Sequence, residues 1–66
     1  MEVTLNAKLM DVKMSKNGKR YLVLYADGSL FNVFLKEENK TNYNEHLGKD
    51  VNIKVKLYEP KFIQAV

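Results

Sequence analysis

The chain has no cysteine, so neither a disulfide nor a thiolate metal site can stabilise it. This absence matters because 66 residues make one small domain, and a chain of this length buries only about 60% of its unfolded surface. We therefore expect a single domain over residues 1–66 that gains stability from a tight β-fold or from burial in a dimer.

Residue types that carry catalysis are scarce. His46 is the only histidine, and Ser15 and Ser29 both lie in turn sequences without a neighbouring base. The glycines are isolated from one another, so no glycine-rich phosphate loop is present, and one histidine with scattered acids does not make a metal-ligand cluster. We expect a protein that is not an enzyme and that holds no metal and no cofactor.

Long hydrophobic runs are also absent. The longest run, residues 21–26, is far too short to cross a bilayer, and Met1-Glu2 is not the start of a signal peptide. We expect a cytoplasmic protein without a membrane partner.

The net charge is small, at +3. This value permits an anionic partner without requiring one. The distribution is more informative than the sum, because residues 1–20 and 49–66 are basic and residues 21–48 are acidic on balance.

Residues 20–35, with the sequence RYLVLYADGSLFNVFL, organise the rest of the chain. Two apolar runs are joined here by Asp27-Gly28, and a two-residue Asp-Gly loop between such runs predicts a β-hairpin, since both turn positions need a positive φ. Counting outward from the turn pairs Tyr25 with Leu30 and Tyr21 with Phe34.

Alternation along the two strands then gives the hairpin two faces. The face expected to form core carries Leu22, Leu24, Phe31, Val33 and Leu35. The opposite face carries Tyr21, Val23, Tyr25, Leu30, Asn32 and Phe34. A small domain does not leave three aromatic rings bare without a reason, so we expect a ligand or a partner to cover this second face.

The first strand changes phase midway. Val3, Leu5, Ala7 and Leu9 alternate with polar residues, whereas beyond Leu9 the apolar set becomes Met10, Val12 and Met14. One extra residue of this kind predicts a β-bulge, which bends a strand sharply. A strand that ends near Met10 and is followed by a loop is the alternative.

The remaining segments complete a five-strand pattern. Asn17-Gly18 predicts a second hairpin between the first strand and the strand at Tyr21. Residues 36–44 are a polar connection, and residues 45–48 suit a single helical turn. Residues 50–58 alternate as a strand with a basic outer face, and residues 61–66 form a short last strand after the break at Glu59-Pro60.

This order predicts an all-β fold, a small five-stranded OB-like barrel. Strands one to three form a meander, a polar connection with a short helical turn follows, and strands four and five close the pattern. The phase slip near Leu9 is compatible with a fully closed barrel and with an open, strongly bent sheet.

Three short segments, NGKRY at 17–21, LFNVFLK at 30–36 and LGKDV at 47–51, together with Tyr43, resemble the small OB-type single-stranded-DNA-binding (helix-destabilising) proteins of filamentous phages and related mobile elements. The resemblance covers roughly residues 17–66. It implies a dimer that coats single-stranded DNA cooperatively, with exposed rings for stacking and basic side chains for the backbone. The chain is shorter than these proteins and lacks their long hairpin arm.

Single strands are bound by a basic groove that carries aromatic platforms. In an OB barrel the bases lie across strands two and three, between the loops that join strands one to two and four to five. The expected nucleic-acid-binding residues are Lys13, Lys16, Lys19, Arg20, Tyr21, Tyr25, Phe34, Lys54, Lys56 and Lys61. We expect sequence-nonspecific binding of single-stranded DNA during replication or transfer, by a homodimer.

Two alternatives stay open at this point. The aromatic face can instead dock a protein, either in a small interaction or inhibitor module or in the seam of a dimer. RNA is the other alternative ligand, because stacking does not distinguish the sugars and only a contact to the 2′-hydroxyl would do so.

Overall fold

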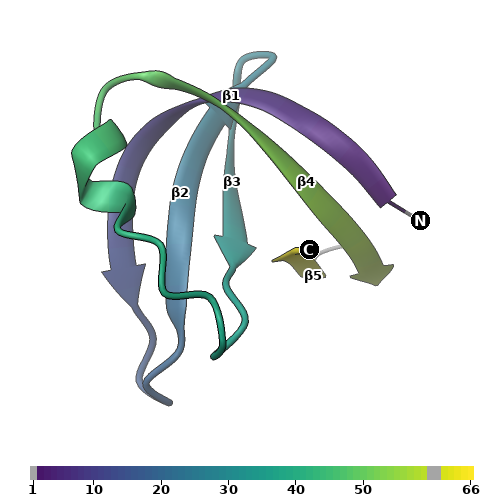
Figure 1. The fold of residues 1–66 in the computed structure, drawn as a ribbon. Helices are drawn as coiled ribbons and strands as arrows, with labels where there is room; N and C mark the ends of the chain where they lie inside the picture. The colour runs from purple at the N-terminus through teal and green to yellow at the C-terminus, as the bar shows by residue number, and fades with distance from the viewer. Residues whose placement is uncertain (1, 60–61) are drawn as a thin grey trace.

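The computed structural model describes residues 2–59 and 62–66 and contains five strands and one 3₁₀ turn in that part of the chain (Figure 1). The elements are β1 Glu2–Met14, β2 Arg20–Ala26, β3 Ser29–Phe34, η1 Tyr43–His46, β4 Asp50–Glu59 and β5 Phe62–Ala65. The described residues contain no helix that is long and apolar enough to span a membrane.

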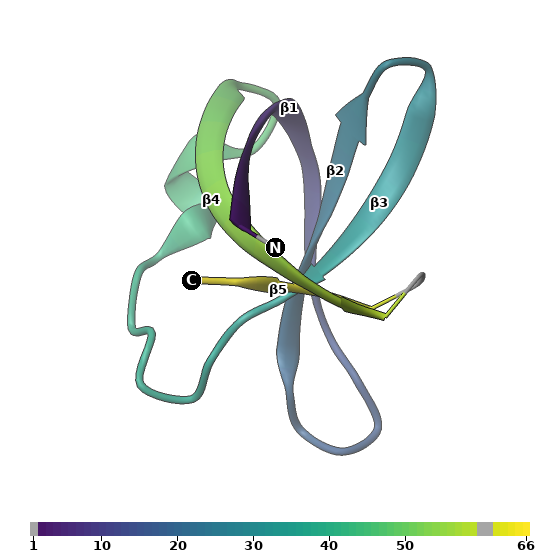
Figure 2. The ribbon, with the colours of Figure 1, turned by 90° about the vertical axis from the view of Figure 1, so that its right-hand side faces the viewer.

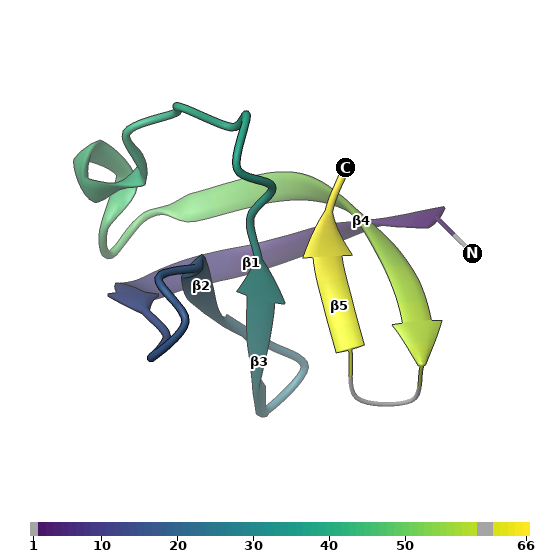
Figure 3. The ribbon, with the colours of Figure 1, turned by 90° about the horizontal axis from the view of Figure 1, so that it is seen from below.

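The strands form a closed barrel in the order β1-β2-β3-β5-β4, and β4 pairs back onto β1. β3 and β5 are the parallel neighbours, which Figure 3 shows side by side, and the other pairs are antiparallel. The predicted five-stranded OB-like barrel is therefore confirmed, and the barrel is closed.

The β2–β3 hairpin has the predicted register at every pair from Ala26 opposite Ser29 to Tyr21 opposite Phe34. Asp27 and Gly28 both have positive φ, at 51° and 78°, as a two-residue hairpin turn requires. Figure 2 shows the tip of this hairpin extending away from the rest of the barrel.

Small and medium apolar side chains fill the barrel interior. Those buried among the described residues are Ala7, Leu9, Leu22, Leu24, Val33, Leu35, Ile53, Val55 and Ala65. Four of the five residues expected on the core face of the hairpin are in this set. Phe31 is only half-buried, because it lies two residues nearer the hairpin tip than Val33, and the tip extends away from the rest of the barrel (Figure 2).

The predicted bulge lies in β1 and lets this strand serve both of its neighbours. The register against β2 shifts between Leu9 and Asp11, which leaves Met10 as the extra residue. Residues 2–8 of β1 pair with β4 and residues 8–14 pair with β2, so the strand curves over the barrel in Figure 1. The alternative of a strand ending near Met10 is wrong.

The apolar set expected beyond the bulge is only partly correct. Val12 packs against the core, but the side chains of Met10 and Met14 are 49% and 65% exposed. Met10 has no registered partner on β2, and Met14 lies opposite Arg20, where β1 has passed the end of the packed interior.

The β1–β2 hairpin is closed by a three-residue loop, Lys16-Asn17-Gly18. The backbone N–H of Ser15 donates to the carbonyl of Lys19 at 2.8 Å, and Gly18 supplies the positive φ, at 81°. This loop length fixes the register, which places Lys13 opposite Tyr21. A two-residue loop between Lys16 and Lys19 would instead have placed Met14 opposite Tyr21 and turned Lys13 inward.

The connection between β3 and β4 is tied down by Arg20. Its guanidinium donates to the carbonyl oxygens of Asn39 and Thr41, the latter at 3.2 Å. The helical turn occupies Tyr43–His46, two residues earlier than expected, because the Asn42 side chain accepts the backbone N–H of Asn44 at 3.2 Å and so starts the turn there.

Candidate nucleic-acid interface

One row of registered residues crosses the outside of the barrel from β1 to β4. Along it Lys13 lies opposite Tyr21, Tyr21 opposite Phe34, Phe34 opposite Gln64, and Gln64 opposite Lys56. Directly paired residues project to the same side of a sheet, so these five side chains all lie on the outside of the barrel, and we call them the outer row. The outer row has two rings and an amide at its centre and an ammonium group at each end.

Tyr21 and Phe34 form a ring pair at the centre of the outer row. Their ring centroids are 5.3 Å apart and the planes are tilted by 43°. Both side chains are half-buried and neither belongs to the core. The ring pair therefore presents aromatic surface outside the barrel and is held in place by its own contact, which is worth about 0.5–1.5 kcal/mol beyond area burial.

Further lysines flank the ring pair on the side of the β1–β2 loop. An open pocket of about 310 Å³ is lined by Lys19, Phe34, Lys36 and Gln64. Glu37 and Glu38 also line this pocket and offset part of the positive charge. The lysine ammonium groups are on exposed or half-buried residues, where they can approach a backbone phosphate that passes the rings.

The other end of the hairpin has a different character. Tyr25 and Leu30 lie opposite each other and are 45% and 63% exposed, and we call them the tip patch. Lys8 lies opposite Tyr25, but it also lies opposite Asp50, and Asp27 lines the same pocket. The tip patch is thus apolar, and charged side chains of both signs surround it. Tyr25 lies four residues, or about 13 Å, from Tyr21 along β2.

The structure brings together some of the predicted site residues and separates others. Lys13, Lys19, Tyr21, Phe34 and Lys56 gather around the outer row, and Lys16 is exposed in the neighbouring three-residue loop.

Arg20 projects to the opposite side of β2 from Tyr21, where it binds the connection. Lys54 lies on β4 two residues before Lys56, and its ammonium group is 3.2 Å from the Glu2 carboxylate. Lys61 lies outside the described residues, as does Pro60 of the predicted break between the last two strands.

Sequence reasoning missed Lys36 and Gln64. Lys36 could have been found by extending the hairpin count one step beyond Arg20 and Leu35, which brings Lys36 opposite Lys19. Gln64 could not, because its position depends on the parallel pairing of β5 with β3, two strands that are distant in sequence. No local sequence pattern predicts the pairing of β5 with β3.

Comparison of the chain with protein-family models, with curated proteins and with solved structures found no match, so the functional argument depends on the geometry of this surface. Within residues 2–59 and 62–66, no three histidine, aspartate or glutamate side chains lie close enough together to hold a metal ion.

Proposed function

We propose that this protein binds single-stranded DNA without sequence specificity and without enzymatic activity. The observation that carries the proposal is the ring pair of Tyr21 and Phe34, which faces outward in the middle of a row with Lys13 at one end and Lys56 at the other. Rings offer stacking to any base, and lysines offer charge to the phosphates between the bases.

The ring pair favours a single strand over a duplex. A base can stack on a side chain only when its own face is free, and in a duplex both faces are occupied by neighbouring base pairs. Each stacked base contributes about 1–3 kcal/mol, so a duplex that offers only phosphates should bind more weakly by that amount.

The sugar and the biological setting follow from the resemblance to phage and mobile-element proteins. On that basis we favour DNA over RNA, and we propose that the protein protects or organises single strands in the cytoplasm during replication or transfer. Nothing in the ring pair itself excludes RNA, because a base stacks equally well from either backbone.

We further propose a homodimer formed through the tip patch. Leu30 is 63% exposed and Tyr25 is 45% exposed, so two large, mainly apolar side chains lie opposite each other on the surface of a small chain. Lys8 and Asp27 lie beside this patch, so in a dimer the Lys8 ammonium of one copy could pair with the Asp27 carboxylate of the other. The tip patch lies away from the ring pair, so dimerisation leaves the outer row accessible.

The decisive experiment is a titration with one labelled oligonucleotide as single strand, as duplex and as the RNA of the same sequence, at two salt concentrations. Single-stranded DNA should bind more tightly than the duplex, and Tyr21→Ala and Phe34→Ala should each weaken it by about 5- to 150-fold. Tyr25→Ala removes a ring from the same strand and face but from the tip patch, so its effect on affinity is compared with its effect on the oligomeric state, and the affinity of the variant's monomer should match that of the wild-type monomer.

The titration also separates the alternatives. Tighter binding of the RNA would reassign the ligand. Equal binding of single strand and duplex, or no effect of either ring variant while the circular dichroism spectrum is retained, would leave the aromatic face as a protein-docking surface and overturn the proposal.

A further inference from the structure

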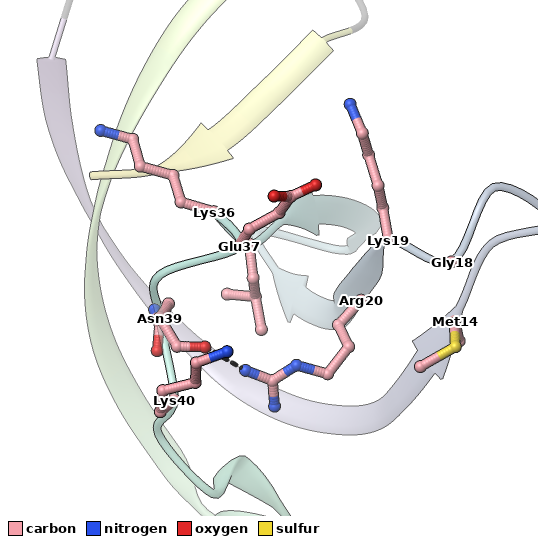
Figure 4. Close-up of a pocket in the computed structure, with 9 residues that line it drawn as sticks. Met14, Gly18, Lys19, Arg20, Lys36, Glu37, Asn39 and Lys40 are labelled. Carbon is pink, nitrogen blue, oxygen red and sulfur yellow. Dashed lines mark hydrogen bonds between the residues drawn. The ribbon is translucent and has the colours of Figure 1, made fainter.

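A second, larger pocket lies at the end of the barrel between the β1–β2 hairpin and the β3–β4 connection (Figure 4). Its volume is about 590 Å³, within the range of roughly 300–1,000 Å³ that small-molecule sites occupy. We call it the end pocket. Met14 and Leu35 give it apolar surface, and Met14 is 65% exposed there, which is unusual for an apolar residue on the inward side of a strand.

The charge of the end pocket is strongly positive. Lys19, Arg20, Lys36 and Lys40 line it, against the single carboxylate of Glu37. Figure 4 shows Arg20 extending from β2 toward Asn39 and Lys40 of the connection, with Met14 on the other side of the pocket. The lining residues carry three more positive than negative charges, and Figure 4 shows the ammonium groups of Lys19 and Lys36 directed away from Arg20 and Lys40, so the positive charge is spread along the lining and favours an anionic occupant that extends beyond Arg20.

The Arg20 guanidinium is held by two hydrogen bonds and keeps further N–H donors for a ligand. Two of its N–H groups donate to the carbonyls of Asn39 and Thr41, which fix the guanidinium in the pocket wall. A guanidinium has five N–H donors and a flat face, so the others can reach a phosphate oxygen and the face can stack on a base. The pocket thus joins apolar and planar surface to positive charge, the combination that a nucleotide requires.

The end pocket is continuous with the outer row. Lys19 and Lys36 line both the end pocket and the smaller pocket that contains Phe34 and Gln64. A strand that leaves the ring pair therefore passes two lysines and arrives at the end pocket. The opposite direction, toward Tyr25, leads to a surface where Asp27 and Asp50 offset the charge of Lys8.

We propose that the end pocket is a second nucleotide subsite, which receives a base and its phosphate from the strand that crosses the ring pair. This inference depends on the proposed function, and it adds a direction to it: the strand runs from Lys56 across the rings and turns past the β1–β2 loop. The tip patch then lies off the path of the nucleic acid.

The test measures the affinity of the full chain for oligothymidines of increasing length. Lys40→Gln removes a cation that belongs to the end pocket and not to the outer row. One lost phosphate contact should weaken long oligomers about eightfold at 50 mM salt and about threefold at 200 mM, and should leave the shortest bound oligomers unchanged.

Lys49→Gln is the matched control, because it removes the same charge from an exposed position where Lys49 bonds Leu9 through its backbone. Equal losses for Lys49→Gln and Lys40→Gln, or an equal loss at every length, would overturn the second subsite. If wild-type protein binds long and short oligomers and Lys40→Gln changes neither, the subsite is wrong and the proposed function stands. If wild-type protein binds no single strand at all, the proposed function itself fails.

A methionine-methyl NMR spectrum gives an independent reading on folded protein. Met14 lines the end pocket and Met10 does not, although both are exposed. A base that stacks in the pocket should shift the Met14 methyl resonance through its ring current and leave Met10 in place. An unshifted Met14 at saturation with a long oligothymidine would contradict the inference.

Discussion

Replacing Lys13 with glutamine removes the cation that lies directly opposite Tyr21 and leaves the rings in place. The expected effect is on the salt dependence of binding. Counterion release gives a log–log slope of about −0.7 for each phosphate that a lysine neutralises on a single strand. Four lysines surround the ring pair, at positions 13, 19, 36 and 56. The wild-type slope for a short oligothymidine should therefore be about −2.8.

That slope means a loss of about 50-fold in affinity between 50 and 200 mM salt. Lys13→Gln should reduce the slope to about −2.1 and the loss to about 18-fold. Tyr21→Ala should act differently: stacking releases no counterions, so the affinity should fall at every salt concentration while the slope is retained. The two variants together separate the charge of the site from its rings.

Fluorescence anisotropy of a labelled oligothymidine at four or five salt concentrations measures these slopes. Lys8→Gln is the control, because Lys8 lies on the same strand and face but opposite Tyr25, and its slope should match the wild type. A wild-type slope near zero would refute the reasoning, since it would mean that no phosphate is contacted. A change for Lys8→Gln equal to that for Lys13→Gln would show that the lysines act through net charge alone.

Three further results are expected from the fold and its surface. Arg20→Met removes the bonds to the Asn39 and Thr41 carbonyls and should cost about 1–3 kcal/mol, seen as a thermal midpoint several degrees lower. Leu22→Ala creates a cavity at a fully buried position and should cost about 2–5 kcal/mol in urea unfolding, whereas a smaller loss would mean that the barrel collapses around the gap. Leu30→Lys should convert the dimer to a monomer in sedimentation equilibrium with an unchanged circular dichroism spectrum, and a wild type that is already monomeric would rule out the tip patch as a seam.

Local pattern was sufficient for the β2–β3 hairpin. A two-residue Asp27-Gly28 turn fixes the register of both strands, because each step outward adds one pair, and so the ring pair could be named in advance. The bulge near Leu9 was equally visible, since a bulge shifts the apolar phase of the sequence by one residue.

Two kinds of detail were beyond the sequence. The length of the β1–β2 loop decides whether Lys13 or Met14 faces Tyr21, and Asn17-Gly18 fits a two-residue turn as well as the three-residue loop that forms. The end pocket depends on Arg20 meeting the Asn39 carbonyl, a contact between segments that no periodicity relates. Composition could indicate that lysines are plentiful, but not which of them share a surface.

Two changes at Met10 test whether the bulge closes the barrel: Met10→Ala removes only its side chain, and deletion of Met10 removes the bulge itself. Met10 is 49% exposed, so Met10→Ala should change the free energy of unfolding by less than about 1 kcal/mol. Deleting Met10 is a different perturbation, because it keeps Leu9 and Val12 inward and Lys13 outward while removing the residue that bends the strand.

The bend lies where β1 leaves β4 and joins β2, and there the backbone of Leu9 bonds Lys49 and Gly48 at 3.0 and 2.8 Å. A straightened β1 cannot follow β4 over residues 2–8 and then turn to follow β2 over residues 8–14, so the deletion should lose several kcal/mol and lower the urea m-value as the barrel opens. Urea unfolding followed by tyrosine fluorescence compares the deletion with Met10→Ala. A deletion variant as stable as Met10→Ala would mean that the curvature of β1 comes from strand twist, and that the extra residue does not close the barrel.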